Sequence, residues 1–159
     1  MKRIIYPLLA IVIILAISCK KDKPTNPEPK SQWQVDGKNF KGYAKSYPLG
    51  SEFSATDSIG QYGFPVGNYV AIKFYYTYWP TKNGTYTVTN SPGDSTQCSV
   101  TTGNLSTVPI GDYTSIASTS EVVITVSSAG KLSATFSGIV LSNYNNTKTA
   151  IVSGALVEQ

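Results

Sequence analysis

Histidine is absent from the 159 residues, and arginine occurs once, at Arg3. Without histidine the chain cannot hold a His-assisted serine or cysteine nucleophile, or a metal site built on imidazole. Arginine is the residue that bidentate phosphate and base recognition favours, so its scarcity argues against a nucleic-acid partner. The formal charge of +4 falls to +2 once Lys2 and Arg3 are removed, so the positive charge does not restore that partner.

Carboxylates are also few, with nine aspartate and glutamate residues in the chain. A glycosidase needs two carboxyl groups that face each other across a cleft. Asp36, Asp94 and Asp112 each adjoin a glycine, as turn residues do, and Glu121 and Glu158 flank predicted strands. We therefore predict that the protein is not an enzyme and has no catalytic residues, no metal and no cofactor.

The N-terminal segment begins with two cations, followed by an uncharged and mostly apolar run at residues 4–18. This order is typical of an export signal. As a helix the run would reach about 22 Å, which is short of the hydrocarbon thickness of about 30 Å, so no permanent membrane span is expected.

The stretch "LAISC" ends this run at Cys19. It resembles the lipobox of bacterial lipoproteins, which implies cleavage before Cys19, a diacylglycerol on its thiol and an acylated amino terminus. The resemblance predicts a lipid anchor in the cell envelope, at the outer membrane. Surface export in this group resembles a rule that requires acidic residues just after the cysteine. Asp22 is the only acidic residue among the lysines there, which favours the periplasmic face. The alternative is a secreted protein cut near an incidental cysteine.

Three segments follow from these features. Residues 1–18 are the predicted signal peptide, and residues 19–32 are a proline- and lysine-rich tether that cannot bury enough apolar surface to fold. Residues 33–159 are long enough for one domain. A lipidated Cys19 leaves Cys98 without a disulfide partner, and alternation places it on the side of Val100, as a small buried hydrophobe.

The domain has the sequence pattern of β structure. Short runs rich in Val, Ile, Thr, Tyr and Phe alternate with clusters of Gly, Asn, Asp, Pro and Ser. Hairpin turns are predicted at Asp36-Gly37, 127–131 and 143–147, and a phase change beyond Gly138 predicts a bulge. Strands are expected near 39–46, 52–57, 68–79, 84–89, 96–102, 113–118 and 149–157, besides those that flank the hairpins.

About nine or ten short strands fit a single antiparallel β-sandwich or a flattened β-barrel, with a meander at the C-terminus. The pieces "WQVDGKNFKG", "GTYTV" and "KLSATFSGIVL...TKTAIVSGAL" resemble small uncharacterised lipoproteins of Bacteroidota. The resemblance covers most of residues 33–157. It implies an envelope location and an all-β fold, and it supplies no catalytic residues.

The run "KFYYTYWP" is the most aromatic part of the chain. On one strand over 68–79, alternation places Tyr75, Trp79 and Lys73 on the solvent face and Phe74 in the core. The three solvent-side residues are the predicted ligand site, with rings that could stack on sugars or grip a peptide. The alternative is that Trp79 anchors a turn or that a loop covers the rings.

We expect a non-catalytic binding module for glycan or peptide. The alternatives are an accessory subunit of an envelope complex and a lipocalin-like barrel that encloses a small apolar ligand. The triplets "DSI" at 57–59 and "DST" at 94–96 resemble the O-glycosylation motif of Bacteroidota, which implies Ser58 and Ser95 as acceptors. A simple Asp-Ser turn is the alternative for both.

Overall fold

The computed structural model describes residues 28–60, 62, 64–76, 78–106 and 112–159. Within them the fold is all-β, with one single-turn 3-10 helix, η1 (Pro48–Gly50). The strands are β1 (Ser31–Val35), β2 (Lys38–Tyr47), β3 (Glu52–Ile59), β4 (Pro65–Phe74), β5 (Gly84–Val88), β6 (Gln97–Asn104), β7 (Tyr113–Ser115), β8 (Glu121–Val126), β9 (Leu132–Asn143) and β10 (Thr149–Val157).

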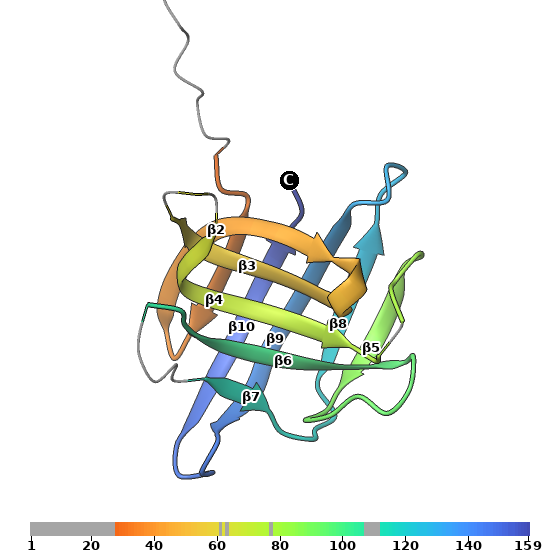
Figure 1. The fold of residues 1–159 in the computed structure, drawn as a ribbon. Helices are drawn as coiled ribbons and strands as arrows, with labels where there is room; N and C mark the ends of the chain where they lie inside the picture. Colours follow the sequence, from red (N-terminus) through yellow and green to blue (C-terminus); the bar gives the residue numbers. More distant parts are fainter. Residues whose placement is uncertain (1–27, 61, 63, 77, 107–111) are drawn as a thin grey trace, which may run out of the picture.

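The strands form one closed sheet (Figure 1). Hydrogen-bonded neighbours follow the order β10-β1-β2-β3-β4-β6-β5-β8-β9, and β9 pairs again with β10. The short strand β7 bridges β6 and β9. In Figure 1 β2, β3, β4 and β6 cross in front of β8, β9 and β10. The barrel alternative is therefore confirmed, and the sandwich is wrong, because backbone pairing continues all the way round.

The expectation of a purely antiparallel sheet is also wrong. β5 and β6 run parallel, with Thr87 opposite Gln97 and Val88 opposite Cys98. Parallel neighbours usually need a long crossover, but here the end of β5 meets only the start of β6. The loop at residues 89–96 therefore has to carry the chain back by only about two residues of strand length. A short loop can do this without a long crossover.

Strand β2 links the two sides of the barrel. Its first half pairs with β1 through a hairpin in which Asp36 and Gly37 both have positive φ, at 48° and 80°, as predicted. Its second half pairs with β3. The corner lies at Gly42, where any Cβ would overlap the carbonyl oxygen of Thr56. Glycine is therefore required where the strand bends this closely against its neighbour.

The C-terminal meander β8-β9-β10 is confirmed. The register of β9 with β10 shifts at Ser153, and Gly138 has a φ of 63°, so the bulge predicted from the phase change is present. The Gly138 N–H donates to Ser153 Oγ at 2.8 Å, which gives the bulged backbone a partner. The two predicted turns on either side of β9 are also present.

Strand β4 differs from the prediction at both ends. It begins at Pro65 and ends at Phe74, instead of running from 68 to 79. After Phe74 the chain turns, with the Tyr78 N–H donating to Tyr75 O at 2.9 Å. The rings of the aromatic run therefore do not alternate along one strand, because the last four leave it.

The barrel interior is filled by apolar side chains. Phe53, Ile72, Ile124, Leu141 and Leu156 are among the large side chains that are fully buried. Cys98 belongs to the same cluster as a free thiol with no exposed surface, which confirms its predicted role. Desolvation by burial raises the pKa of the Cys98 thiol to about 12.

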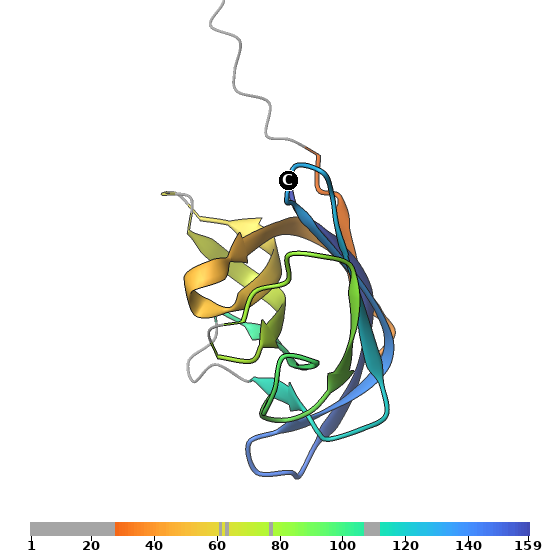
Figure 2. The same cartoon turned by 90° about the vertical axis from the view of Figure 1, so that its right-hand side faces the viewer.

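The two ends of the described chain lie at the same end of the barrel (Figures 1 and 2). The Gln159 side-chain amide donates to Glu28 O at 2.6 Å, and Ser31 Oγ accepts from the Val157 N–H at 2.9 Å. Strand β1 thus begins at Ser31, two residues before the predicted domain start at 33. No helix long and apolar enough to cross a membrane occurs among the described residues.

Candidate functional site

The outer face of β2, β3, β4 and β6 carries the candidate site. Alternation sends Phe53, Val70 and Ile72 into the core, so their neighbours along each strand point outward. The strand registers align these outward positions in three rows across the sheet. The rows are Tyr43, Thr56, Tyr69 and Gly103; Lys45, Ser54, Ala71 and Thr101; and Tyr47, Glu52, Lys73 and Ser99.

The middle row is low at Ser54, Ala71 and Thr101, whereas its fourth member, Lys45, is long and exposed. Ala71 is only 7% exposed, although it is not part of the core cluster. Its side chain points outward, so it is shielded by taller neighbours on the same face. Tyr43 and Tyr69 lie in the row on one side, and Tyr47 and Lys73 in the row on the other. The small side chains at Ser54, Ala71 and Thr101 leave a depression in the middle of this face.

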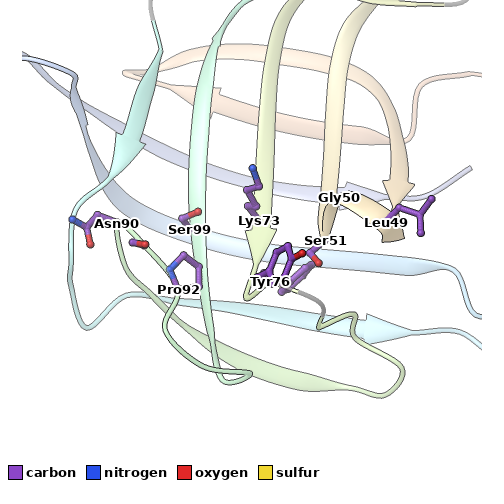
Figure 3. A pocket seen from close by; sticks show the side chains of 10 residues that line it. Leu49, Gly50, Ser51, Lys73, Tyr76, Asn90, Pro92 and Ser99 are labelled. Carbon is purple, nitrogen blue, oxygen red and sulfur yellow. The ribbon is translucent and has the colours of Figure 1, made fainter.

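Two adjoining pockets occupy this face. The larger, of about 1110 Å³, is lined by side chains of all three rows and by Tyr62 and Phe64 of the β3–β4 hairpin. The smaller, of about 460 Å³, lies at the far end of β4 between η1 and the loop before β6 (Figure 3). Both are lined by Gly50 and Lys73. We call the two together the outer trough.

Lys73 stands at the junction of the trough. In Figure 3 it lies between Ser99 on one side and Tyr76 with Ser51 on the other. Tyr76 is 82% exposed and presents its ring to solvent at the end of the smaller pocket. Glu52 faces Lys73 directly in the β3–β4 register, so one acidic and one basic group lie side by side midway along the trough.

Two tyrosines of the larger pocket are held by specific contacts. The Tyr69 hydroxyl donates to Asp112 Oδ1 at 2.7 Å. Desolvation, together with this bond and the Asp112 charge, raises the pKa of Tyr69 well above its ordinary 10.0. Lys45 Nζ lies 5.5 Å from the centroid of the Tyr47 ring, within reach of a cation–π contact. Such restraints hold the rings in place before any ligand arrives.

The predicted ligand residues fall in three different places. Lys73 lines both pockets. Tyr75 is exposed beside the trough but is not among its lining residues. Trp79 turns inward and packs against Phe74, with ring centroids 5.8 Å apart, so it does not share a face with Tyr75. A binding role for the three together stays a prediction, and only Lys73 lies within the trough.

The structure describes some of the other predicted sites. Ser58 and Ser95 are both exposed, and their glycosylation stays a prediction. Asp94 Oδ1 accepts from both the N–H and the hydroxyl of Thr96, the local turn expected as the alternative, and these bonds lower the pKa of Asp94. Cys19, the signal peptide and most of the tether lie outside the described residues. No group of three potential metal ligands occurs within the part of the chain that the structure describes.

The sequence did not point to Tyr43, Tyr47 and Tyr69 as site residues. Tyr43 and Tyr47 lie on β2 and Tyr69 lies on β4, and the register that brings these strands together through β3 is a tertiary property. The signal available in the sequence was that alternation along each strand places these tyrosines on outward-facing positions. Comparison with protein-family models, curated proteins and solved structures found no match to this chain.

Proposed function

We propose that this chain is a lipid-anchored protein of the bacterial cell envelope that binds an extended glycan along the outer trough. The observation that carries the proposal is the meeting of two pockets at Lys73 on one face of the barrel. Strand β4 underlies the trough, and its ten residues span about 33 Å. That length suits a chain of several sugar rings rather than one small molecule.

The chemistry of the walls supports a glycan. Tyrosine rings offer apolar faces to the C–H side of sugars, and their hydroxyls offer hydrogen bonds at the rim. Glu52 and Lys73 add an acceptor and a donor midway along the trough. Beside Lys45, the floor consists of the small uncharged side chains of Ser54, Ala71 and Thr101, so a flat ring can approach the sheet there.

The closed sheet weighs against one common mode of peptide binding. Peptides often add a strand to an exposed sheet edge. The trough lies on β2, β3, β4 and β6, each of which is already paired on both sides. A ligand there must therefore be held by side chains, which favours a glycan over a strand-forming peptide.

The barrel interior is filled by side chains, so we propose that the ligand binds on the outer face. A lipocalin-like barrel would hold its ligand among Phe74, Tyr76 and Tyr78. Phe74 is buried and Tyr78 packs against the core, where its hydroxyl lies 3.3 Å from that of Tyr86, whereas Tyr76 points to solvent. The three rings do not surround a common space, so we place the ligand outside.

The anchor at Cys19 and the envelope location rest on the resemblance of "LAISC" to the lipobox. We propose the outer membrane, with the periplasmic face favoured. The described chain is compatible with a tether, because Pro29 and Lys30 are exposed and lead directly to β1. An envelope partner that occupies the trough in place of a glycan is the outcome that would support an accessory subunit instead.

Affinity electrophoresis of the full chain through gels that contain neutral or acidic polysaccharides tests the proposal. We expect at least one polysaccharide to retard the wild type, and the double variant Lys73→Ala with Tyr76→Ala to lose about tenfold in affinity. The matched control is Lys148→Ala with Tyr144→Ala, an exposed pair in the turn between β9 and β10. Equal retardation of both variants, or none of the wild type by any polysaccharide, would overturn glycan binding in the trough.

A further inference from the structure

The hairpin between β3 and β4 ends in exposed apolar side chains. Tyr62 is 82% exposed, Phe64 is 71% exposed and Ile59 is 49% exposed. Leu105 lies next to this hairpin, since its N–H donates to Gly67 O at 2.8 Å. Residues 58–67 contain no charged residue. An uncharged turn with three large apolar side chains in solvent is unfavourable unless another surface covers them. We call Ile59, Tyr62 and Phe64 the hairpin tip.

The backbone that carries the tip is held by hydrogen bonds. The Gly60 N–H donates to Phe64 O at 2.8 Å, which closes the turn. The Gly67 N–H donates to Ser106 Oγ at 3.1 Å, and Gly67 has a φ of 78° at the irregularity where the β3–β4 register shifts. Asp57, the acidic residue nearest to the tip in sequence, accepts 2.9 and 2.7 Å bonds from the backbone and side chain of Asn68. The apolar side chains are thus presented outward by a bonded frame.

The hairpin tip lies at the end of the barrel where the described chain begins. Figures 1 and 2 show the hairpin, the start of β1 and the C-terminus at this same end. Cys19 precedes Glu28 by nine positions, so the main chain at Cys19 can be no more than about 32 Å from this end of the barrel. The opposite end carries the turn between β9 and β10 (Figure 1).

Aromatic and aliphatic side chains on an uncharged turn have the chemistry of a membrane-interface contact. Tyrosine is favoured at the headgroup level because its ring is apolar and its hydroxyl is polar. Phenylalanine and isoleucine gain free energy by reaching the acyl boundary. Lys30 directly precedes β1 and Lys131 lies in the turn between β8 and β9, segments that reach this end, and both lysines are exposed where anionic headgroups would attract them. Glu158, also at this end, accepts from the Leu132 N–H at 2.8 Å through one carboxylate oxygen.

We infer that the hairpin tip inserts Ile59, Tyr62 and Phe64 into the interfacial layer of the bilayer to which Cys19 is anchored. This inference rests on the lipid anchor of the proposed function. Two contacts, the lipid and the hairpin tip, restrict the orientation of the barrel more than the lipid alone can. Because Ile59, Tyr62 and Phe64 also line the larger pocket, one end of the trough then lies at the bilayer, and Tyr76 lies at its other end.

Quenching by brominated lipids tests this contact in the full-length lipidated protein. The protein is reconstituted on vesicles of phosphatidylcholine with a minority of phosphatidylglycerol, with or without bromine high on the acyl chains. Tyr62→Trp places a reporter at the tip, and Tyr144→Trp places one at the opposite end, where Tyr144 is 98% exposed. We expect Tyr62→Trp to lose more fluorescence to bromine than the wild type and to shift its emission to the blue. Tyr144→Trp is expected to match the wild type.

The outcomes separate the two proposals. If the protein stays on the vesicles but Tyr62→Trp is quenched no more than Tyr144→Trp, the contact is overturned and the anchor stands. If mass spectrometry of the same preparation shows an unmodified Cys19 and the protein stays in solution, both the anchor and the contact are overturned. A second variant, Ile59→Ser with Phe64→Ser, is expected to remain lipidated and vesicle-bound while losing the quenching of the Tyr62→Trp reporter.

Discussion

Phe74 and Trp79 meet edge to face across a tight turn, with ring centroids 5.8 Å apart and ring planes at 86°. The Tyr86 ring packs on the other side of Phe74 at 5.1 Å. The turn between Phe74 and Trp79 leaves Tyr75 and Tyr76 outside the core. The aromatic run is therefore divided between core and surface, because its two ends belong to the core and its middle residues face solvent beside the trough.

Trp79→Ala should destabilise the fold, whereas Tyr75→Ala should not. Trp79 is partly buried against the core, so its loss is expected to lower the free energy of unfolding by about 2 kcal/mol. Tyr75 has no such packing partner among the described ring contacts, and its loss should cost less than about 0.5 kcal/mol. Urea denaturation followed by far-UV circular dichroism compares them. Equal midpoints for the two variants would contradict the assignment of Trp79 to the core.

Gly42→Ala should be among the most damaging single changes. A Cβ at Gly42 would overlap the Thr56 carbonyl, and two paired strands cannot separate there without breaking the corner of the barrel. We expect a loss of about 3 kcal/mol or more. Gly50→Ala is the control, since a Cβ there has no neighbour within 4 Å. Thermal melts of both variants would show the difference, and a Gly42→Ala protein as stable as wild type would be inconsistent with this corner.

Cys98 should resist thiol reagents while the barrel is folded. The thiol is fully buried and its pKa is raised to about 12, so almost no thiolate forms at pH 8. We expect labelling with an aromatic disulfide reagent to proceed only through unfolding and to become fast in guanidinium. The denatured protein should then show one reactive thiol per chain if Cys19 is lipidated, and two if it is not. Fast labelling of the native protein would mean that the interior opens more readily than its packing indicates.

Alkaline pH should weaken the fold. Burial raises the pKa of Tyr69 and Tyr86 above 10.0, so the folded state holds their protons more tightly than the unfolded state does. The associated stability is complete below pH 10 and is lost progressively as the pH rises above that value. Urea midpoints measured from pH 7 to about pH 11 should fall at the alkaline end. Tyr86→Phe should reduce the slope of that fall, and an unchanged slope would show that Tyr86 is not the group responsible.

Local sequence patterns predicted most of the strands and all three hairpins on which a prediction was made. Asp36-Gly37 specifies its turn because few other pairs adopt two positive φ angles at low cost. The apolar phase change across Gly138 specified the bulge because side chains alternate with a period of two. Cys98 was predicted to be buried for the same reason. These features depend on neighbours in the chain, which the sequence displays directly.

The end of β4, the closure of the sheet and the trough were decided only by tertiary structure. The predicted strand extended to residue 79 because aromatic residues favour strands. In the structure Trp79 packs on Phe74, so the chain must turn between them and β4 ends at Phe74. The pairing of β10 with β1 closes the barrel across more than a hundred residues of sequence. The trough exists because the pairing of β2, β3 and β4 aligns Tyr43 with Tyr69 and Tyr47 with Lys73. Alternation along one strand determines which side chains point outward, whereas register between strands determines which of them meet.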